Sequence, residues 1–272
     1  MTRFRLARLF AYGMVTAWTL FVVLPLLWMV MAAFKTRREI FTDPLGLPSG
    51  FSGESFERVW GVGLGFFMLN SAIVTFLAVG VIVLVSGMAA YVLARTNTFA
   101  LRMVYLAIVA GFAVPITAVL LPLYQMVSSA GLLNSYFGIV LVYAAYGIPF
   151  TTILFYAFFL DFPRELEEAA RLDGCSRVQI FFRVIVPLSG PAVASAAIFQ
   201  AVFVWNEFLL ALVMLTKPAM KTLPVGILQL RGEFSSDWPA IMAGLALATV
   251  PILALFIALQ KYFVRSLAGL GK

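Results

Sequence analysis

The sequence predicts an all-α, polytopic membrane protein with six transmembrane helices. Three observations support this fold class: 63% of the 272 residues are hydrophobic, only 11% are charged, and six long apolar runs alternate with polar segments. A soluble domain has about 45–50% apolar and about 25% charged residues. A soluble protein of this size keeps much of its surface in water, so it could not bury such an excess. Disorder is excluded as well, because it requires few hydrophobic residues.

Each predicted span is an apolar run long enough to cross the hydrocarbon core, which takes roughly 20 helical residues. The runs cover residues 9–34, 66–93, 103–127, 136–160, 187–215 and 239–264. The first run follows three arginines, but it is too long for a signal peptide and lacks an A-x-A cleavage pattern, so we expect it to be retained. Prolines inside the later runs are tolerated in membrane helices. They fit kinks around a central pathway and kinks that serve packing alone equally well.

Basic residues are distributed unevenly over the two sides of the membrane that six spans would create. The side with both termini carries 12 lysines and arginines, and the other side carries 7. Positive charge is retained in the cytoplasm, so both termini are predicted to be cytoplasmic. The net charge of +7 is therefore attributed to membrane orientation and not to nucleic acid binding. With this orientation, residues 36–60 are predicted to form an ordered external loop. The whole chain, 1–272, is expected to form a single membrane domain.

The residue inventory excludes several chemistries. The sequence has no histidine and a single cysteine, Cys175, so HExxH zinc sites, histidine-dependent nucleophiles, internal disulfides and CxxC metal sites are excluded. The G-x-x-x-x-G-K-[ST] loop that cradles nucleotide phosphates does not occur in the sequence. We therefore expect a chain that is not an enzyme and that binds no cofactor or metal of its own.

The predicted cytoplasmic loop 161–186 is long and highly charged for a protein this apolar. It also carries signals for two short helices. Asp161 is placed to cap the first helix, and Gly174 to end it. Ser176 and Gln179 have the spacing of a capping box that would begin the second helix.

Each of these two predicted helices has an apolar stripe at helical spacing. The stripe residues are Leu166, Ala169 and Ala170 in the first helix and Val178, Phe181, Phe182 and Ile185 in the second. Such a hairpin either docks onto a partner protein or lies on the lipid surface. Acidic residues outnumber basic ones in the first helix, and anionic lipid would repel them, so docking is favoured.

The same loop contains the pattern E-A-A-x-x-D-G-x6-F-x3-I-x-P-x3-P, which runs from Glu168 to Pro191. This pattern resembles the EAA loop of binding-protein-dependent ABC permeases. Further matches to such permeases lie at residues 70–71, 121–124, 131–134, 148–150, 205–208, 222–226 and 260–265. Together they resemble the carbohydrate-uptake branch, and within it the smaller maltose permease subunit.

The resemblance implies a type I importer in the prokaryotic inner membrane. A second permease subunit, usually a different chain, would line one pathway together with this one. Two cytoplasmic ATPases, which carry ATP and Mg, would bind the EAA loops, and an external binding protein would deliver sugar. The implied ATPase-docking residues are Glu165, Glu168, Ala169, Ala170, Arg171, Asp173 and Gly174.

Two further sets of residues are candidates for contacts outside the EAA loop. The loop between the last two spans is implied to contact the binding protein through Thr222, Leu223, Pro224 and Gly226. The pathway candidates are Asn70, Trp205, Asn206 and Glu207. Sugars stack on aromatic faces and bond to amides, but a tryptophan near a span end is by default an interface anchor.

An ion-coupled secondary transporter of a small polar solute is the main alternative. Such transporters place ionisable residues inside the membrane, each at a cost of about 2.5–3.5 kcal/mol. The predicted spans are almost free of charge apart from Glu207, and no inverted repeat is evident. An intramembrane enzyme is the second alternative, and the absence of histidine and of paired acids in the spans disfavours it.

Overall fold

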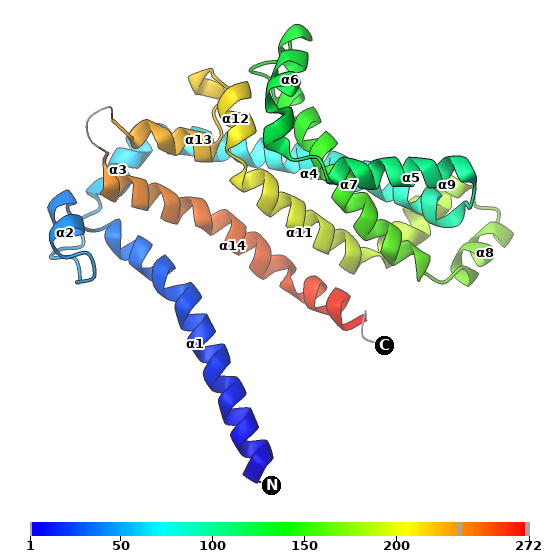
Figure 1. Ribbon diagram of the computed structural model, residues 1–272, viewed down its shortest axis with the longest axis horizontal. Coiled ribbons are helices and arrows are strands. Elements are labelled where there is room, and N and C mark those ends of the chain that lie inside the picture. Colours follow the sequence, from blue (N-terminus) through cyan, green and yellow to red (C-terminus); the bar gives the residue numbers. More distant parts are fainter. Residues whose placement is uncertain (1, 233–235, 270–272) are drawn as a thin grey trace. The chain divides into compact units, whose positions relative to one another are not determined.

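A computed structural model describes residues 2–232 and 236–269, with side chains for residues 8–232 and 236–261. Helices dominate these residues, alongside one isolated antiparallel bridge between Arg231 and Ser236 (Figure 1). The predicted all-α class is therefore confirmed. The chain also divides into two compact units, unit 1 with Met1–Phe66 and Gly226–Pro251, and unit 2 with Phe67–Val225 and Ile252–Lys272.

The helices follow one another along the chain with short connections. They are α1 (Thr2–Ala32), α2 (Arg37–Thr42), α3 (Glu54–Gly61), α4 (Leu64–Arg95), α5 (Phe99–Phe112), α6 (Ile116–Ser129), α7 (Tyr136–Leu160), α8 (Glu165–Leu172), α9 (Arg177–Ile180), the π-helix η1 (Phe181–Ile185), α10 (Val186–Leu188), α11 (Gly190–Asn206), α12 (Leu209–Met214), the 3₁₀ turns η2 (Pro218–Met220) and η3 (Leu228–Leu230) around α13 (Leu223–Ile227), and α14 (Trp238–Gly269).

Four helices are long and apolar enough to cross a membrane by themselves. They are the segments Arg8–Ala32 of α1, Leu64–Arg95, Tyr136–Leu160 and Trp238–Lys261 of α14, and they coincide with the first, second, fourth and sixth predicted spans. The number rises to six when each of two bent helix pairs is counted as one span. The prediction of a polytopic membrane protein is thus confirmed, and the predicted number of six spans is reached when each bent pair is counted as one span.

The predicted third span, residues 103–127, is broken in the middle. Its two halves, α5 and α6, are bent by 104° relative to each other. Pro115 stands at the break in an extended conformation, with φ −70° and ψ 131°. Proline has no backbone N–H and disfavours the helical conformation of the residue before it, here Val114. The prolines were predicted to kink the spans, and in this run the structure shows a full break at Pro115.

The predicted fifth span, residues 187–215, is interrupted at both ends. At Ser189 the chain bends by 80° between the helical segment Arg177–Leu188 and α11. Pro191 lies in the first turn of α11, where a missing N–H costs no helical bond. At the other end α11 stops at Asn206, and the extended Glu207 leads into the separate helix α12.

Two hydrophobic clusters hold unit 2 together. The first joins α4, α7, α11 and α12 through fully buried side chains such as Ile82, Tyr143 and Leu210. The second joins the other ends of α4 and α7 to the segment α8–η1, around Phe155 and Ile180. The loop that the sequence marked as a docking hairpin is thus packed firmly against the ends of two spans.

Unit 1 contains α1 and the segment predicted as an ordered external loop, which does carry two short helices, α2 and α3. The loop is tied together at Glu39, whose carboxylate accepts hydrogen bonds from the backbone N–H groups of Thr36 at 2.7 Å and Ser49 at 3.0 Å. Bonds from Ser49 and Thr36 lower the pKa of Glu39 to about 2. By contrast, the apolar side chains of α1 are exposed, and its most apolar stretch has no buried residue. Such a helix requires lipid or another protein around it.

Candidate functional site

The charged loop folds as two short helices that meet at Gly174, as predicted. The end of α8 is a Schellman motif, in which the N–H of Gly174 donates to the carbonyl of Arg171 and the N–H of Cys175 to that of Ala170, both at 3.0 Å. Gly174 has a φ of +82°. A residue with a Cβ pays roughly 1–2 kcal/mol for this left-handed conformation, so glycine suits the position.

The start of the second helix also follows the prediction. The backbone N–H of Ser176 donates to the side chain of Gln179 at 2.8 Å, and the N–H of Gln179 donates back to the Ser176 hydroxyl at 3.4 Å. The predicted cap of the first helix is wrong, however. Asp161 ends α7, and α8 begins after Arg164 without any side-chain cap. Three acids in its first turn interact favourably with the positive end of the helix instead.

The face of α8 that packs against unit 2 differs from the predicted apolar stripe. Its buried residues are Ala170 and, unexpectedly, Glu167, whose exposed fraction is only 2%. Leu166 and Ala169 of the predicted stripe are exposed, as is Leu172 at 90%. We call these three residues the outer edge of α8. In the second helix only part of the stripe is buried, because Phe181 and Ile185 face the core while Val178 and Phe182 are exposed.

The buried Glu167 is held by charge and hydrogen bonds. Its Oε1 accepts from Nε of Arg95 at 2.6 Å, and its Oε2 accepts from the Tyr91 hydroxyl at 2.9 Å. The side chains of Arg95 and Glu167 are 11% and 3% exposed, so this is a buried ion pair. Arg171 lies farther away, with 3.7 Å between its Nη2 and Oε2 of Glu167.

Arg95 links the loop to two membrane helices at once. It is the last residue of α4, and its Nη1 and Nη2 donate to the carbonyls of Phe159 at 2.6 Å and Phe162 at 3.0 Å. The last carbonyls of a helix have no partner within the helix. Arg95 donates hydrogen bonds to carbonyls at the end of α7 while it pairs with Glu167 of α8. We call Arg95, Glu167 and Tyr91 the buried clamp.

Sequence reasoning did not single out the buried clamp. Arg95 counted only toward the charge on the cytoplasmic side, and Glu167 was one acid among several in the loop. One signal was available: Glu167 and Ala170 are three residues apart and therefore share a helical face. If Ala170 packs inward, its charged neighbour must do so as well, and it then needs a buried basic partner.

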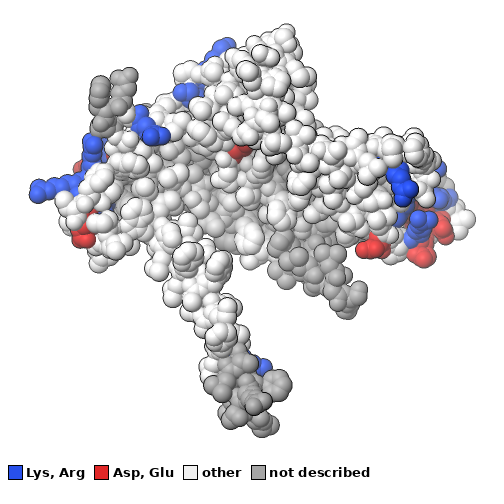
Figure 2. All heavy atoms as spheres, in the orientation of Figure 1, with Lys and Arg blue, Asp and Glu red and all other residues white. Residues whose placement is uncertain are grey.

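The structure gathers the predicted ATPase-docking residues on one short stretch, but on different faces. Ala170 is buried within the chain itself. The exposed members of the set are Glu165, Glu168, Ala169, Arg171, Asp173 and Gly174. Figure 2 shows acidic and basic side chains together at the end of the molecule that holds α8 and α9, whereas much of the neighbouring surface is uncharged. Docking through these residues stays a prediction.

The predicted binding-protein loop is fixed to α4 at its beginning. Nδ2 of Asn70 donates to the carbonyls of Ala219 and Lys221, both at 2.9 Å, and the hydroxyl of Ser71 accepts from the N–H of Leu223 at 2.8 Å. Three of the four predicted contact residues, Thr222, Leu223 and Gly226, are buried, and Pro224 is partly so. The first exposed stretch of this loop is 216–219, and Gln229, Arg231 and Gly232 are exposed farther along the chain.

The predicted pathway residues use most of their polar groups within the chain. Glu207 accepts from the Tyr143 hydroxyl at 2.7 Å and from the N–H groups of Leu210 at 2.8 Å and Ala211 at 3.1 Å, so it caps α12. The remaining candidates are similar: Oδ1 of Asn70 accepts from Tyr136, Asn206 donates to a carbonyl of its own helix, and Trp205 is 6% exposed. Their role in a pathway stays a prediction.

No group of three or more metal-ligating side chains occurs in the part of the chain with described coordinates. The site therefore consists of a rigidly held helical hairpin with an exposed apolar edge between charged side chains. Such a surface can bind another protein and transmit movement to the helices behind it.

Known proteins match the chain over most of its length. Residues 82–269 match the family model described as "Binding-protein-dependent transport system inner membrane component". The chain is 40% identical over 248 residues to the probable ABC transporter permease protein YurM of Bacillus subtilis, covering 91% of this chain and 83% of that protein. It is 35% identical over 249 residues to the sulfoquinovosyl glycerol transport system permease protein SmoH of Agrobacterium fabrum, covering 91% and 87%.

The fold also has a counterpart among solved structures. A chain of a bacterial ABC transporter involved in the import of the acidic polysaccharide alginate superimposes with a TM-score of 0.82, at 22% sequence identity. The match covers 95% of this chain and 97% of that chain. At this level of identity the likeness establishes the type I importer permease fold and not the substrate.

Proposed function

The chain belongs to the family of binding-protein-dependent transport system inner membrane components, and from this premise we propose that it is the permease subunit of an ATP-driven importer of a sugar or sugar derivative. The relative SmoH, named for sulfoquinovosyl glycerol transport, and the alginate importer with the same fold support a carbohydrate substrate. The ion-coupled transporter considered from the sequence has no support from this family.

The observation that carries the proposal is the outer edge of α8, an exposed apolar surface on a helix whose inner face is fixed by a buried ion pair. In a free chain this apolar surface would be exposed to water, whereas a cytoplasmic ATPase subunit could cover it. The exposed Glu168 and Arg171 on either side of Ala169 supply charges for the rim of such an interface. The partner supplies ATP hydrolysis, because this sequence lacks a phosphate-binding loop.

The buried clamp gives this docking a mechanical consequence. Arg95 bonds to α7 and α8 while it belongs to α4, so a movement of α8 by the ATPase would be passed to the ends of two spans. We assign the coupling of hydrolysis to transport to this connection. Glu167 and Arg95 are positioning residues in this scheme, since they hold the docking helix without forming its outer surface.

The remaining partners are assigned by surface. The exposed apolar face of α1 is suited to lipid and to a second permease subunit. The exposed stretch 216–219, held in place by Asn70, is suited to an external binding protein that delivers the sugar. We propose that both chain termini lie in the cytoplasm, which the excess of basic residues on that side supports.

Copurification of the ATPase with an outer-edge variant tests the proposal. Ala169→Trp adds bulk to the outer edge without disturbing a packed side chain, so it should insert into the membrane normally and lose the ATPase. Ala100→Trp is the matched control, because Ala100 is also exposed and lies at the start of α5 on the same predicted side. ATPase assembly at the wild-type level with Ala169→Trp would overturn the docking assignment.

A further inference from the structure

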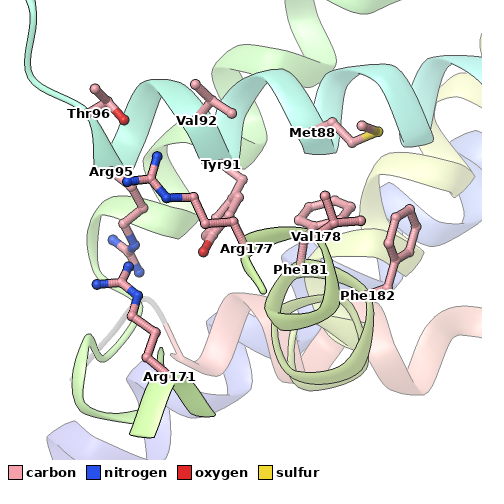
Figure 3. A pocket seen from close by; sticks show the side chains of 10 residues that line it. All are labelled: Met88, Tyr91, Val92, Arg95, Thr96, Arg171, Arg177, Val178, Phe181 and Phe182. Carbon is pink, nitrogen blue, oxygen red and sulfur yellow. The ribbon is translucent and has the colours of Figure 1, made fainter. Parts of the chain in front are cut away.

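A pocket of about 170 Å³ opens in unit 2 between the end of α4 and the segment α9–η1. Its two ends differ in chemistry. Figure 3 shows the guanidinium groups of Arg95, Arg171 and Arg177 gathered at one end and the side chains of Met88, Val178 and Phe182 at the other. The pocket is therefore amphipathic, with a basic end and an apolar end.

The basic end carries an excess of positive charge. Arg95 and Arg171 share the single carboxylate of Glu167. For Arg177, no ion pair or side-chain hydrogen bond occurs among the residues with described side chains. The other acids of α8, such as Glu165 and Glu168, do not line the pocket. Three guanidinium groups and one carboxylate give this end of the pocket a net positive charge, which a further anion would neutralise.

The apolar end continues onto the surface of a span. Met88 and Val92 of α4 are 44% and 48% exposed, on a helix long and apolar enough to cross the membrane. Arg95 is the last residue of that helix, so in a membrane the basic end would lie on the headgroup side of the hydrocarbon core. A ligand here would have its anionic head beside the arginines and its apolar body along the apolar side chains of α4.

We propose that this pocket binds an anionic phospholipid of the cytoplasmic leaflet, with its phosphate at the three arginines and the first methylene groups of one chain against Met88 and Phe182. Guanidinium groups suit phosphate because their planar donors can bind two oxygens at once. Basic pockets between membrane helices on the cytoplasmic side are a known form of lipid recognition. A pocket of this volume takes only that part of the lipid, and the rest of each chain stays in the bilayer.

A protein ligand is the rival explanation, since an acidic side chain of a partner could also approach Arg177. The exposed apolar surface of α4 favours lipid, because apolar side chains on a candidate membrane span are suited to acyl chains, whereas an ATPase would dock from the cytoplasm. The lipid proposal requires only that the chain lies in a membrane. It does not depend on sugar transport.

The test uses the full chain, purified together with its partners and equilibrated with vesicles of phosphatidylcholine that contain a minor share of phosphatidylglycerol. Native mass spectrometry then measures the phosphatidylglycerol retained on the permease. Arg177→Gln should lower this retention about tenfold, because it removes one charge-assisted contact to the phosphate. Arg177→Lys should retain most of the lipid, which separates the loss of charge from misfolding.

Arg183→Gln is the matched control, since Arg183 is exposed in the same segment but does not line the pocket. It should leave lipid retention unchanged, and added inorganic phosphate should not displace the lipid. Equal retention in Arg177→Gln and Arg183→Gln would overturn the proposal. So would loss of the ATPase from Arg177→Gln with unchanged lipid, which would assign the pocket to a protein, or displacement by inorganic phosphate, which would make it a site for free anions.

Discussion

Arg95→Ala removes one partner of the ion pair between α4 and α8 and leaves Glu167 buried at 2% exposure. Loss of one partner of a buried pair costs about 3–5 kcal/mol, because the remaining charge is uncompensated. Glu167 would keep only the Tyr91 hydroxyl at 2.9 Å and the distant Arg171 at 3.7 Å. The carbonyls of Phe159 and Phe162 would each lose the hydrogen bond from Arg95 as well.

Glu167→Gln should be milder, because the amide oxygen can still accept from Arg95 and the shape is kept. A hydrogen bond to a charged group is worth about 1.5–3 kcal/mol, and that sets the expected loss. Glu168→Gln is the matched control on the neighbouring residue. Glu168 is exposed, so its removal should cost only about 0–1 kcal/mol.

Amide hydrogen exchange over α8 in the full chain, reconstituted in lipid nanodiscs, measures these differences. Since 1.4 kcal/mol is a factor of ten in an equilibrium, local opening should become at least about 100-fold more frequent in Arg95→Ala and about tenfold to 100-fold in Glu167→Gln. ATP hydrolysis stimulated by the binding protein should fall in the same order. Exchange in Arg95→Ala that matches Glu168→Gln would refute the assignment of the buried clamp as the connection between loop and spans.

Three further predictions concern the external side of the protein. Asn70→Ala should release the loop that follows α12, at a cost of about 1–3 kcal/mol for the lost buried bonds, and thereby speed tryptic cleavage after Lys221 from outside. The pKa of Glu39 is lowered from 4.5 to about 2 in the folded protein. Its carboxylate therefore stabilises the external loop fully above about pH 4.5, and this stabilisation is lost as the pH falls through 2. In Glu39→Gln the hydrogen-exchange protection of residues 43–49 should no longer depend on pH in this range. For topology, Ser52→Cys in a Cys175→Ser background should react with an impermeant thiol reagent from outside intact cells, and protection there would reverse the predicted orientation.

Features encoded by local sequence were predicted well. The long apolar runs predicted the positions of the four continuous spans, because about twenty consecutive apolar residues match the thickness of the hydrocarbon core. The turn at Gly174 and the capping box at Ser176 were equally predictable, since glycine at a left-handed position and Ser-x-x-Gln at a helix start act within a few residues.

Features that depend on distant partners were not. Pro115 interrupts the third predicted span, yet Pro122 and Pro149 lie inside continuous helices, so proline alone does not decide where a membrane helix breaks. The inward face of α8 was mispredicted for a similar reason. Glu167 can be buried because Arg95, 72 positions earlier in the chain, forms an ion pair with it. No local sequence pattern identifies so distant a partner.

Transport into sealed proteoliposomes distinguishes an ATP-driven importer from an ion-coupled transporter. The full chain would be reconstituted with its copurifying subunits, with ATP enclosed on the ATPase side and the binding protein on the other, and the uptake of labelled sugars measured. An ATP-driven importer should show uptake that requires both ATP and the binding protein and that persists after ionophores collapse all ion gradients. Sugar uptake driven by an imposed ion gradient in the absence of ATP would contradict this prediction.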